Sequence, residues 1–385
     1  MPIGAGVLKV HVEGGPLKIS RFPLLSLAAA LAAATAFAQE APPPAPEPPP
    51  PPVAAPAAAP SQTSNYFNPS IAVIGNFLGI AGHNPVDNQD SLQLRESELS
   101  LQAIVDPYAR GDFFISFSND GVEVEEGYVT FLHLPWDLLV KVGQFKVAFG
   151  KVNTQHLHVL PWPDEPLPIV NLLGTEDGWN DMGVSMAKLL PLPGDTFSEA
   201  TVQVLRGKTE GIFDAPSRGK LAVDAQYRLY RDFGDDNNLE LGFSYGQGWN
   251  GTTADARTTL ENTHLVYRWK PLQGKPYRSF ILRSEYFWSQ REQPDGKQNA
   301  QGFYVSGDYQ LAKRWFTGAR YEFSDHADDA ALRDHGEAVT LTFWPSEFSQ
   351  VRGEFRQRTY ANGVKANEGL LQIQFSIGAH GAHPF

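Results

Sequence analysis

The sequence predicts an all-β chain that closes into a transmembrane antiparallel β-barrel of about 16 strands. Three observations lead to this expectation. From about Ser70 onward, apolar and polar residues alternate with a period of two, which is typical of strands with one apolar and one polar face. The alternating runs reach about 9 to 13 residues, the length of a tilted membrane strand. The connections between the runs alternate between short and long, as they do at the two ends of an outer-membrane barrel.

The first 38 residues have the pattern of an export signal that is cleaved after Ala38. Lys18 and Arg21 give a positive flank, Leu24 to Leu31 an apolar stretch, and residues 36–38 a small-x-small cleavage site. The alternative is a buried N-terminal helix. Removing this segment takes away three basic residues and one acidic residue, so the net charge falls from −12 to −14. Such a charge disfavours electrostatic binding to nucleic acid.

Residues 39–66 predict a Pro/Ala-rich periplasmic spacer ahead of the barrel, which is expected to occupy residues 67–385. From Ala41 to Pro60 the sequence is almost only Pro and Ala, with Glu47 as its sole charge, and this composition forms neither a core nor a sheet ladder. Such a segment is a semi-rigid polyproline arm of about 3.1 Å per residue, or simply disordered. Its partner, if it has one, cannot be named from the sequence.

The alternation can be followed strand by strand along the chain. Within residues 221–229, for example, Leu221 and Val223 lie on one face, and Asp224 and Arg228 lie on the other. A soluble β-sandwich would give the same alternation with its apolar face inward. The tryptophans favour the barrel, because they gather near the ends of the expected strands as interfacial girdles do. The expected strands lie near residues 71, 93, 110, 122, 138, 182, 198, 219, 238, 260, 277, 299, 314, 337, 348 and 368.

The longest connection, from Ala148 to Asn180, follows the fifth expected strand. A barrel of this size has a lumen wide enough to accept an inserted segment, so this third loop is expected to fold inward and narrow the pore. Its prolines lower the entropy that is lost when the loop is held against the wall. The candidate constriction residues are His156, His158, Asp164, Glu165, Glu176 and Asp177.

The two histidines of this loop raise the question of a metal site. They are separated by one residue on an irregular segment, and the sequence shows no third ligand close to them. The expectation is therefore that there is no metal site, and that these side chains hydrogen-bond to the wall or pack within the loop.

The polar faces of the later strands are expected to line the pore with arginines. Loop carboxylates that face these arginines would set up an electric field across the channel. The alternative is that the arginines pair with acidic residues of their own face, namely Asp224, Glu285, Asp308, Glu322 and Glu354, and both arrangements are compatible. The expected pore-wall arginines are Arg228, Arg268, Arg283, Arg320, Arg352 and Arg356.

Four segments share motifs with a known family, namely residues 94–118, 125–131, 142–153 and 172–191. By these segments the chain resembles the phosphate-selective porin O and P group of outer-membrane channels. At expected lumen positions of the second strand, where phosphate-type members tend to have arginines, this chain has Glu96 and Glu98 beside Arg95. That departure favours a general or cation-tolerant channel at least as much as a phosphate-selective one.

The resemblance implies a porin in the outer membrane of a Gram-negative-type bacterium, a water-filled channel for passive diffusion of small hydrophilic solutes or ions. No cofactor and no enzyme activity are expected, since the sequence contains no G-x-S-x-G or H-E-x-x-H motif. The alternative is a structural or tethering barrel with little conductance. Expected partners are outer-membrane lipid, the solutes, the barrel assembly machinery and the other subunits of a homotrimer.

Overall fold

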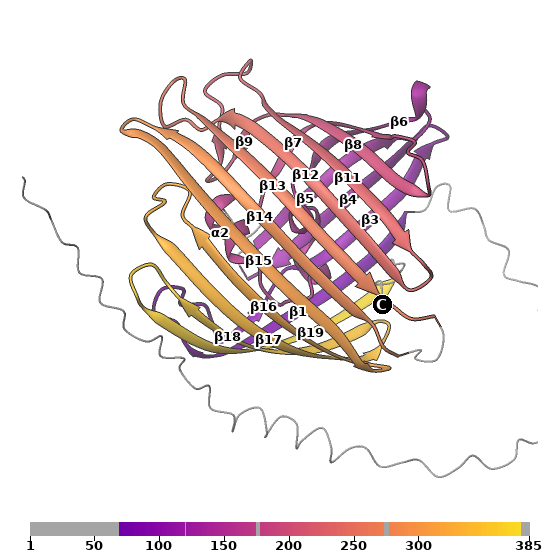
Figure 1. The fold of residues 1–385 in the computed structure, drawn as a ribbon. Coiled ribbons are helices and arrows are strands. Elements are labelled where there is room, and N and C mark those ends of the chain that lie inside the picture. The colour runs from indigo at the N-terminus through magenta and orange to yellow at the C-terminus, as the bar shows by residue number, and fades with distance from the viewer. Residues whose placement is uncertain (1–68, 120, 175–177, 273–276, 379–385) are drawn as a thin grey trace, which may run out of the picture. The chain divides into compact units, whose positions relative to one another are not determined.

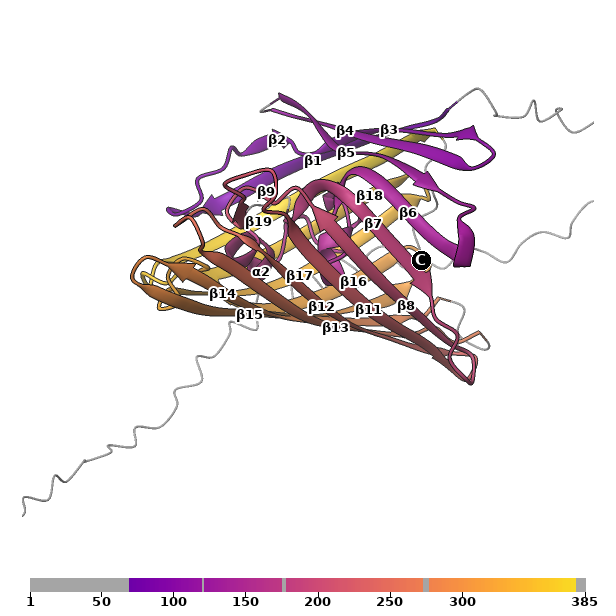
Figure 2. The ribbon, with the colours of Figure 1, turned by 90° about the horizontal axis from the view of Figure 1, so that it is seen from above.

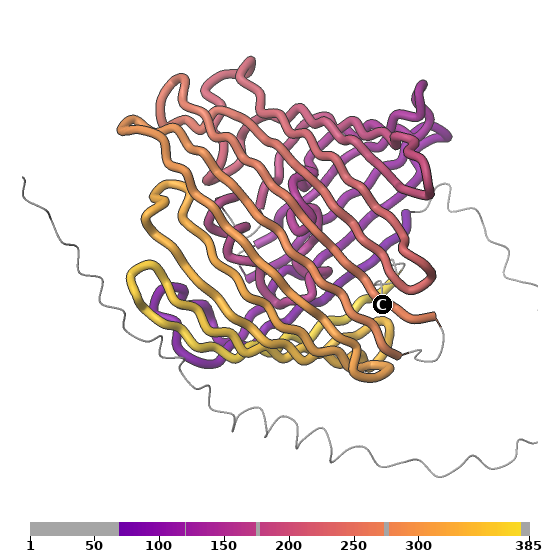
Figure 3. Tube along the Cα trace, viewed as in Figure 1, coloured from indigo at the N-terminus to yellow at the C-terminus, as the bar shows by residue number. Residues whose placement is uncertain are grey.

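The structure is a computed structural model, and it describes residues 69–119, 121–174, 178–272 and 277–378. The expected export signal (1–38) and spacer (39–66) lie outside the described residues, so both stay predictions. Residues 69–378 hold the barrel, whose strands are drawn as arrows in Figure 1 and as a continuous trace in Figure 3.

In the part of the chain that the structure describes, a 17-stranded antiparallel sheet closes on itself. The first strand pairs with the last from Ala72↔Gly378 to His83↔Asn367, so the sheet has no free edge (Figure 2). The strands are β1 (Ser70–His83), β2 (Leu92–Leu94), β3 (Ser97–Asp106), β4 (Ala109–Ser118), β5 (Gly121–Phe131), β6 (Leu138–Lys146), β7 (Asn180–Leu189), β8 (Thr196–Leu205), β11 (Ala222–Phe233), β12 (Asn237–Trp249), β13 (Arg257–Trp269), β14 (Phe280–Gln293), β15 (Gly296–Ala312), β16 (Trp315–Asp325), β17 (Arg333–Ser346), β18 (Ser349–Thr359) and β19 (Lys365–Gly378).

The short strand β2 and the following β3 occupy one position in the barrel. Both pair with β1, β2 through Phe77↔Leu94 and β3 through Ile74↔Glu98, and the register shifts by one residue between them. The shift marks a bulge at Arg95 and Glu96, which interrupts the strand without changing its neighbour. The described barrel therefore has 16 strand positions, and the predicted fold class and strand number are confirmed.

The two faces of the barrel differ in polarity as the alternation predicts. On the outer face Phe355 is 52% exposed and Phe243 is 54% exposed, whereas on the inner face Arg356 is 3% exposed and Asp224 is 1% exposed. Leu221 is also exposed, at 43%. An apolar outer surface of this kind suits lipid, and a soluble sandwich would bury it instead.

The connections follow the expected asymmetry only in part. Compact turns follow β3, β5, β7, β11, β15 and β17, and longer segments follow β1, β6, β8, β12, β16 and β18. The exceptions are the ten residues between β13 and β14, and the two-residue connections after β4 and β14. One of these longer segments, after β8, carries a two-stranded ribbon of β9 (Lys208–Thr209) and β10 (Phe213–Asp214). In the described residues no helix is long and apolar enough to cross a membrane.

Candidate functional site

The longest connection of the barrel, residues 147–179, joins β6 to β7. Both views draw its helix α2 within the outline of the barrel (Figures 1 and 2). Pro166 and Pro168 lie at the start of α2, where proline is well tolerated because the first backbone N–H groups have no partner within the helix. The described helices of the loop are η2 (Val152–Thr154), η3 (Leu157–Val159) and α2 (Leu167–Leu172).

An apolar core fixes this loop to the strands. Trp162 and Trp179 are almost fully buried, although both belong to the loop. The Trp162 ring packs edge-on against Tyr304 of β15, with centroids 5.4 Å apart, and Phe149 lies 5.6 Å from Trp179. The loop is therefore a folded layer with its own packing. Its core also contains Phe145, Val147, Val152, Leu157, Leu160, Ile169, Leu172 and Leu173.

A buried carboxylate of the wall, Glu285 of β14, holds the start of the loop. Its oxygens accept hydrogen bonds from the backbone N–H groups of Lys151 at 2.9 Å and Val152 at 2.8 Å. The Tyr304 hydroxyl and the Asn262 amide also donate to it, at 2.8 and 3.1 Å. A carboxylate with four donors is well satisfied, so Glu285 serves the loop and does not pair with an arginine.

Gly150 precedes these contacts and has a left-handed φ of +70°. A Cβ atom at this position would overlap the Glu285 carboxylate. We expect Gly150→Ala to lower the thermal unfolding temperature more than Gly363→Ala does. Gly363 has φ +79° with nothing within 4 Å of its Cβ position, so its replacement adds only the left-handed backbone cost of about 1–2 kcal/mol. Equal losses in thermal unfolding would show that the Glu285 contact does not constrain Gly150.

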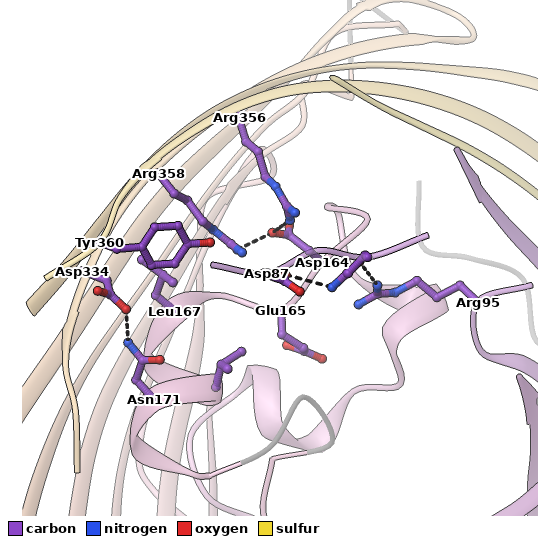
Figure 4. A pocket seen from close by; sticks show the side chains of 12 residues that line it. Asp87, Arg95, Asp164, Glu165, Leu167, Asn171, Asp334, Arg356, Arg358 and Tyr360 are labelled. Carbon is purple, nitrogen blue, oxygen red and sulfur yellow. Dashed lines mark hydrogen bonds and ion pairs between the residues drawn. The ribbon is translucent and has the colours of Figure 1, made fainter. Parts of the chain in front are cut away.

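The middle of the loop is held by one aspartate and three arginines. Asp164 is 4% exposed, and one of its oxygens lies 2.8 Å from Arg320 Nη2. Its other oxygen lies 2.8 Å from Arg356 Nη1 and 2.6 Å from Arg358 Nη2 (Figure 4). Arg320 also lies over the Trp162 ring, 4.9 Å from its centroid. Charge-assisted hydrogen bonds of this kind are strong, and they place Asp164 against β16 and β18.

This arginine cluster changes the acidity of Asp164. Burial by itself raises the pKa of the Asp164 carboxyl, but attraction to Arg320, Arg358 and Arg356 outweighs it and holds the pKa well below its usual value. A depressed carboxyl pKa contributes stability above the unfolded pKa of about 3.9, and this stability is lost only as the pH falls through the lower folded pKa. The Asp164 contact therefore persists in mildly acidic solution.

The beginning of the loop contacts a different group of charges, on β3 and β5. His156 Nδ1 lies 2.6 Å from Glu125 Oε2 and 3.0 Å from Glu98 Oε2, and its Nε2 lies 2.8 Å from Glu126 Oε1. Burial lowers the pKa of His156, but the hydrogen bonds with Glu125 and Glu126 and the negative charge of Glu98 raise it well above its usual value. The side chain is thus a buried cation between three carboxylates at neutral pH.

The two groups of contacts lie on different parts of the inner face. His156 contacts β3 and β5, whereas Asp164 contacts β16 and β18. In the order of the sheet, two strand positions separate β18 from β3, and six separate β16 from β5 by the shorter way. The loop is therefore held by two groups of strands that are not neighbours.

The expected pore-wall arginines all lie on the inner face, but their partners differ in part from the expected ones. Arg283 pairs with Asp308, as expected, whereas Arg228 pairs with Glu199 at 2.7 Å and Arg268 lies 3.6 Å from Glu240. Arg356 pairs with Glu368 at 3.0 Å, and Arg320 with Glu322 at 3.3 Å. Arg352 donates to the Leu160 carbonyl and the Gln372 amide oxygen.

Besides Glu285, two more carboxylates that were expected to pair with arginines do not. Asp224 and Glu354 are buried, and among the described residues none of their carboxylate oxygens has a hydrogen-bond partner. The alternation correctly places both on the inner face. The alternation does not indicate, however, which partner a side chain can contact. The arginines bond to Asp164 and to other carboxylates instead.

The candidate residues of the loop are only partly brought together. His158 and Glu165 are buried, at 4% and 5% exposure, while Glu176 and Asp177 lie outside the described residues. The structure brings a possible third ligand to the two histidines, because Glu98 Oε2 lies 3.0 Å from His156 Nδ1 and 3.7 Å from His158 Nδ1. The missing ligands come from the wall, which the sequence of the loop cannot reveal.

Sequence reasoning missed several residues of this site. Arg358 has the same phase as Arg352 and Arg356, and the alternation alone was enough to find it. Glu125 and Glu126 are consecutive, so strict alternation would place only one of them inside. A register shift opposite Phe114 and Ile115 of β4 accompanies the burial of both.

Cavities beside the loop divide by charge. A cavity of about 550 Å³ is lined by Glu96, Glu123 and Glu125, together with Arg95. On the other side of the loop, a cavity of about 240 Å³ is lined by four cationic side chains, namely Lys151, Arg268, Arg283 and Arg352, and by Asp308. Figure 4 shows a further cavity of about 230 Å³ around Asp164, Arg356 and Arg358.

Comparison with solved structures gives outer-membrane proteins. The anion-selective porin from Comamonas acidovorans aligns with a TM-score of 0.57 at 12% identity, over 80% of this chain and 98% of that chain. The fold is that of an outer-membrane porin. The trimer form of OmpT from Vibrio cholerae, an outer membrane protein, aligns with a TM-score of 0.52 at 11% identity, over 80% and 99% of the two chains. This porin-like barrel is thus of a type that resides in the outer membrane.

A relative found by sequence similarity does not indicate a function for this chain. An uncharacterized protein of Aquifex aeolicus (strain VF5) is 29% identical over 347 residues, which cover 79% of this chain and 72% of the relative. No family model matches the chain. The resemblance to the phosphate-selective porins therefore stays a prediction.

Proposed function

We propose that this porin-like barrel is a passive diffusion channel for small hydrophilic solutes or ions, and that residues 147–179 set its aperture. The observation that carries the proposal is that the loop is held at two separate parts of the polar inner face, by His156 at β3 and β5 and by Asp164 at β16 and β18. A segment fixed at two separate places divides the lumen and leaves polar, charged passages beside it. No reacting group is needed for this activity.

Two charged passages beside the loop give the proposed channel its transverse field. Carboxylates gather where Glu96 and Glu125 line the larger cavity, and cations gather where Lys151, Arg268 and Arg352 line the smaller one. Such a field orders water and disfavours apolar solutes. The glutamates at the larger cavity favour a general channel over a phosphate-selective one. A homotrimer is part of the proposal, since one structural neighbour is described as a trimer form.

The purified protein is expected to give discrete conductance steps in a planar lipid bilayer. A salt gradient across the same bilayer then gives the reversal potential, whose sign shows whether anions or cations pass preferentially. Steps no larger than those of a protein-free bilayer would instead support the structural or tethering barrel. The burial of Trp162 and Trp179 favours this structural or tethering function, because a packed loop narrows the lumen.

A further inference from the structure

We propose that His156, together with Glu96, Glu98 and Glu125, binds one divalent transition-metal ion between the loop and the wall. One nitrogen or oxygen atom from each of these four side chains lies within 4.8 Å of all the others. One imidazole with several carboxylates is a donor set that suits zinc, cobalt, manganese or iron. The site joins the loop to two separate strands, β3 and β5.

Glu98 supplies the first independent sign of a ligand. Its side chain is 2% exposed, and no hydrogen-bond donor among the described residues is assigned to its Oε2 atom. This atom faces His156 Nδ1 at 3.0 Å, but Nδ1 carries one proton at most, and Glu125 Oε2 is nearer to it, at 2.6 Å. A buried carboxylate oxygen without a donor is costly, and a bound cation satisfies it.

The opposite edge of the imidazole supplies the second sign. His156 Nε2 bonds to Glu126 Oε1 at 2.8 Å, and the other oxygen of Glu126 accepts the Lys146 backbone N–H at 3.0 Å. Glu126 thus fixes the ring with Nδ1 pointing toward Glu98 and Glu125. Histidines that bind metal ions are commonly held in this way, by a carboxylate on the nitrogen that does not bind the metal.

The charge of the cluster also calls for a cation. Four wall carboxylates, those of Glu96, Glu98, Glu125 and Glu126, surround a single imidazole, and all but Glu96 are at most 6% exposed. Lys146, a residue that is 9% exposed, lies near these carboxylates. Carboxylates gathered so closely repel one another, and buried charge of this kind is costly. A divalent ion neutralises it.

The distances agree with an ion that replaces the shared proton. Bonds of about 2.0–2.2 Å in a tetrahedron place neighbouring ligand atoms roughly 3.3 Å apart. The 2.6 and 3.0 Å separations at Nδ1 are those of a proton-bridged state, so Glu125 would have to move away by roughly 0.7 Å and Glu98 by roughly 0.3 Å. The cavity of about 550 Å³ lined by Glu96 and Glu125 gives the ion a path to the site.

The test uses the untagged protein, washed with a chelator and titrated with Co²⁺. The wild type is expected to bind one equivalent per chain, with a visible absorption band that Zn²⁺ abolishes by competition. His156→Gln is expected to lose this band, and Glu126→Gln to weaken binding about 10- to 100-fold. The control is His326→Gln, since His326 pairs with Asp334 at 2.9 Å outside the cluster, and it is expected to bind as the wild type does.

Heat-modifiable migration on a gel shows whether each variant is folded. If His156→Gln does not fold, Glu98→Gln takes its place, because it removes the carboxylate without a donor and keeps the imidazole. A wild type without the stoichiometric cobalt band, or a folded His156→Gln protein with unchanged affinity, would overturn the proposal. Neither result depends on conductance, so the metal site and the channel function stand or fall separately.

Discussion

Replacing Asp164 with asparagine is expected to raise the single-channel conductance and to lower the thermal unfolding temperature. The change removes the charge shared by Arg320, Arg356 and Arg358 and leaves three buried guanidinium groups without it. Breaking a buried ion pair by removing one partner costs about 3–5 kcal/mol. The loop is then expected to leave β16 and β18, and the passage widens.

The matched control is Asp195→Asn. Asp195 is exposed in the short turn after β7, and its left-handed φ of +52° suits asparagine. This variant makes the same chemical change outside the barrel, so both measurements are expected to match the wild type. Should Asp164→Asn also match it in conductance and in unfolding temperature, Asp164 does not hold the loop.

Charge reversal at Arg268 is expected to shift the reversal potential toward cation preference. Arg268 lines the smaller cavity, and its side chain is 38% exposed, so the change acts on the passage more than on folding. One unit charge about 5 Å from an ion in water contributes about 0.8 kcal/mol, and Arg268→Glu changes the charge by two units. The cation-to-anion permeability ratio is then expected to rise about tenfold at low salt and less at high salt.

Lys365→Glu is the control for this prediction. Lys365 is exposed at the start of β19, where its neighbour Ala366 faces inward, so its own side chain lies on the outer face. The net charge changes by the same amount without a new charge in the passage. A reversal potential that moves equally in both variants would mean that total charge, not the lining of the cavity, determines selectivity.

The sequence was sufficient for the barrel because its physical signal is local. Period-two alternation depends only on neighbouring residues, and it placed strands near residues 71, 138 and 348, where the observed strands begin at Ser70, Leu138 and Ser349. The same alternation correctly predicted that the arginine side chains lie on the inner face. These are properties of a single strand and its environment, so no knowledge of distant residues was needed.

The site was less accessible from the sequence because it depends on contacts between distant segments. Asp164 lies 192 residues before Arg356, and His156 lies 30 residues after Glu126. Alternation fixes the direction of a side chain, but it does not fix which partner the side chain reaches across the lumen. The bulge between Leu94 and Ser97 and the register shift in β5 change the phase locally, and a strict period of two misses both.

The pairing of β1 with β19 has a consequence for the biogenesis of this protein. Until β19 joins β1, the nascent sheet exposes two rows of unpaired backbone N–H and C=O groups, which invite association with other chains. The arginines that bind Asp164 are translated long after it, in β16 and β18. Chains that stop before β16 are therefore expected to carry an unanchored acidic loop on an open sheet, the kind of product that quality-control proteases remove.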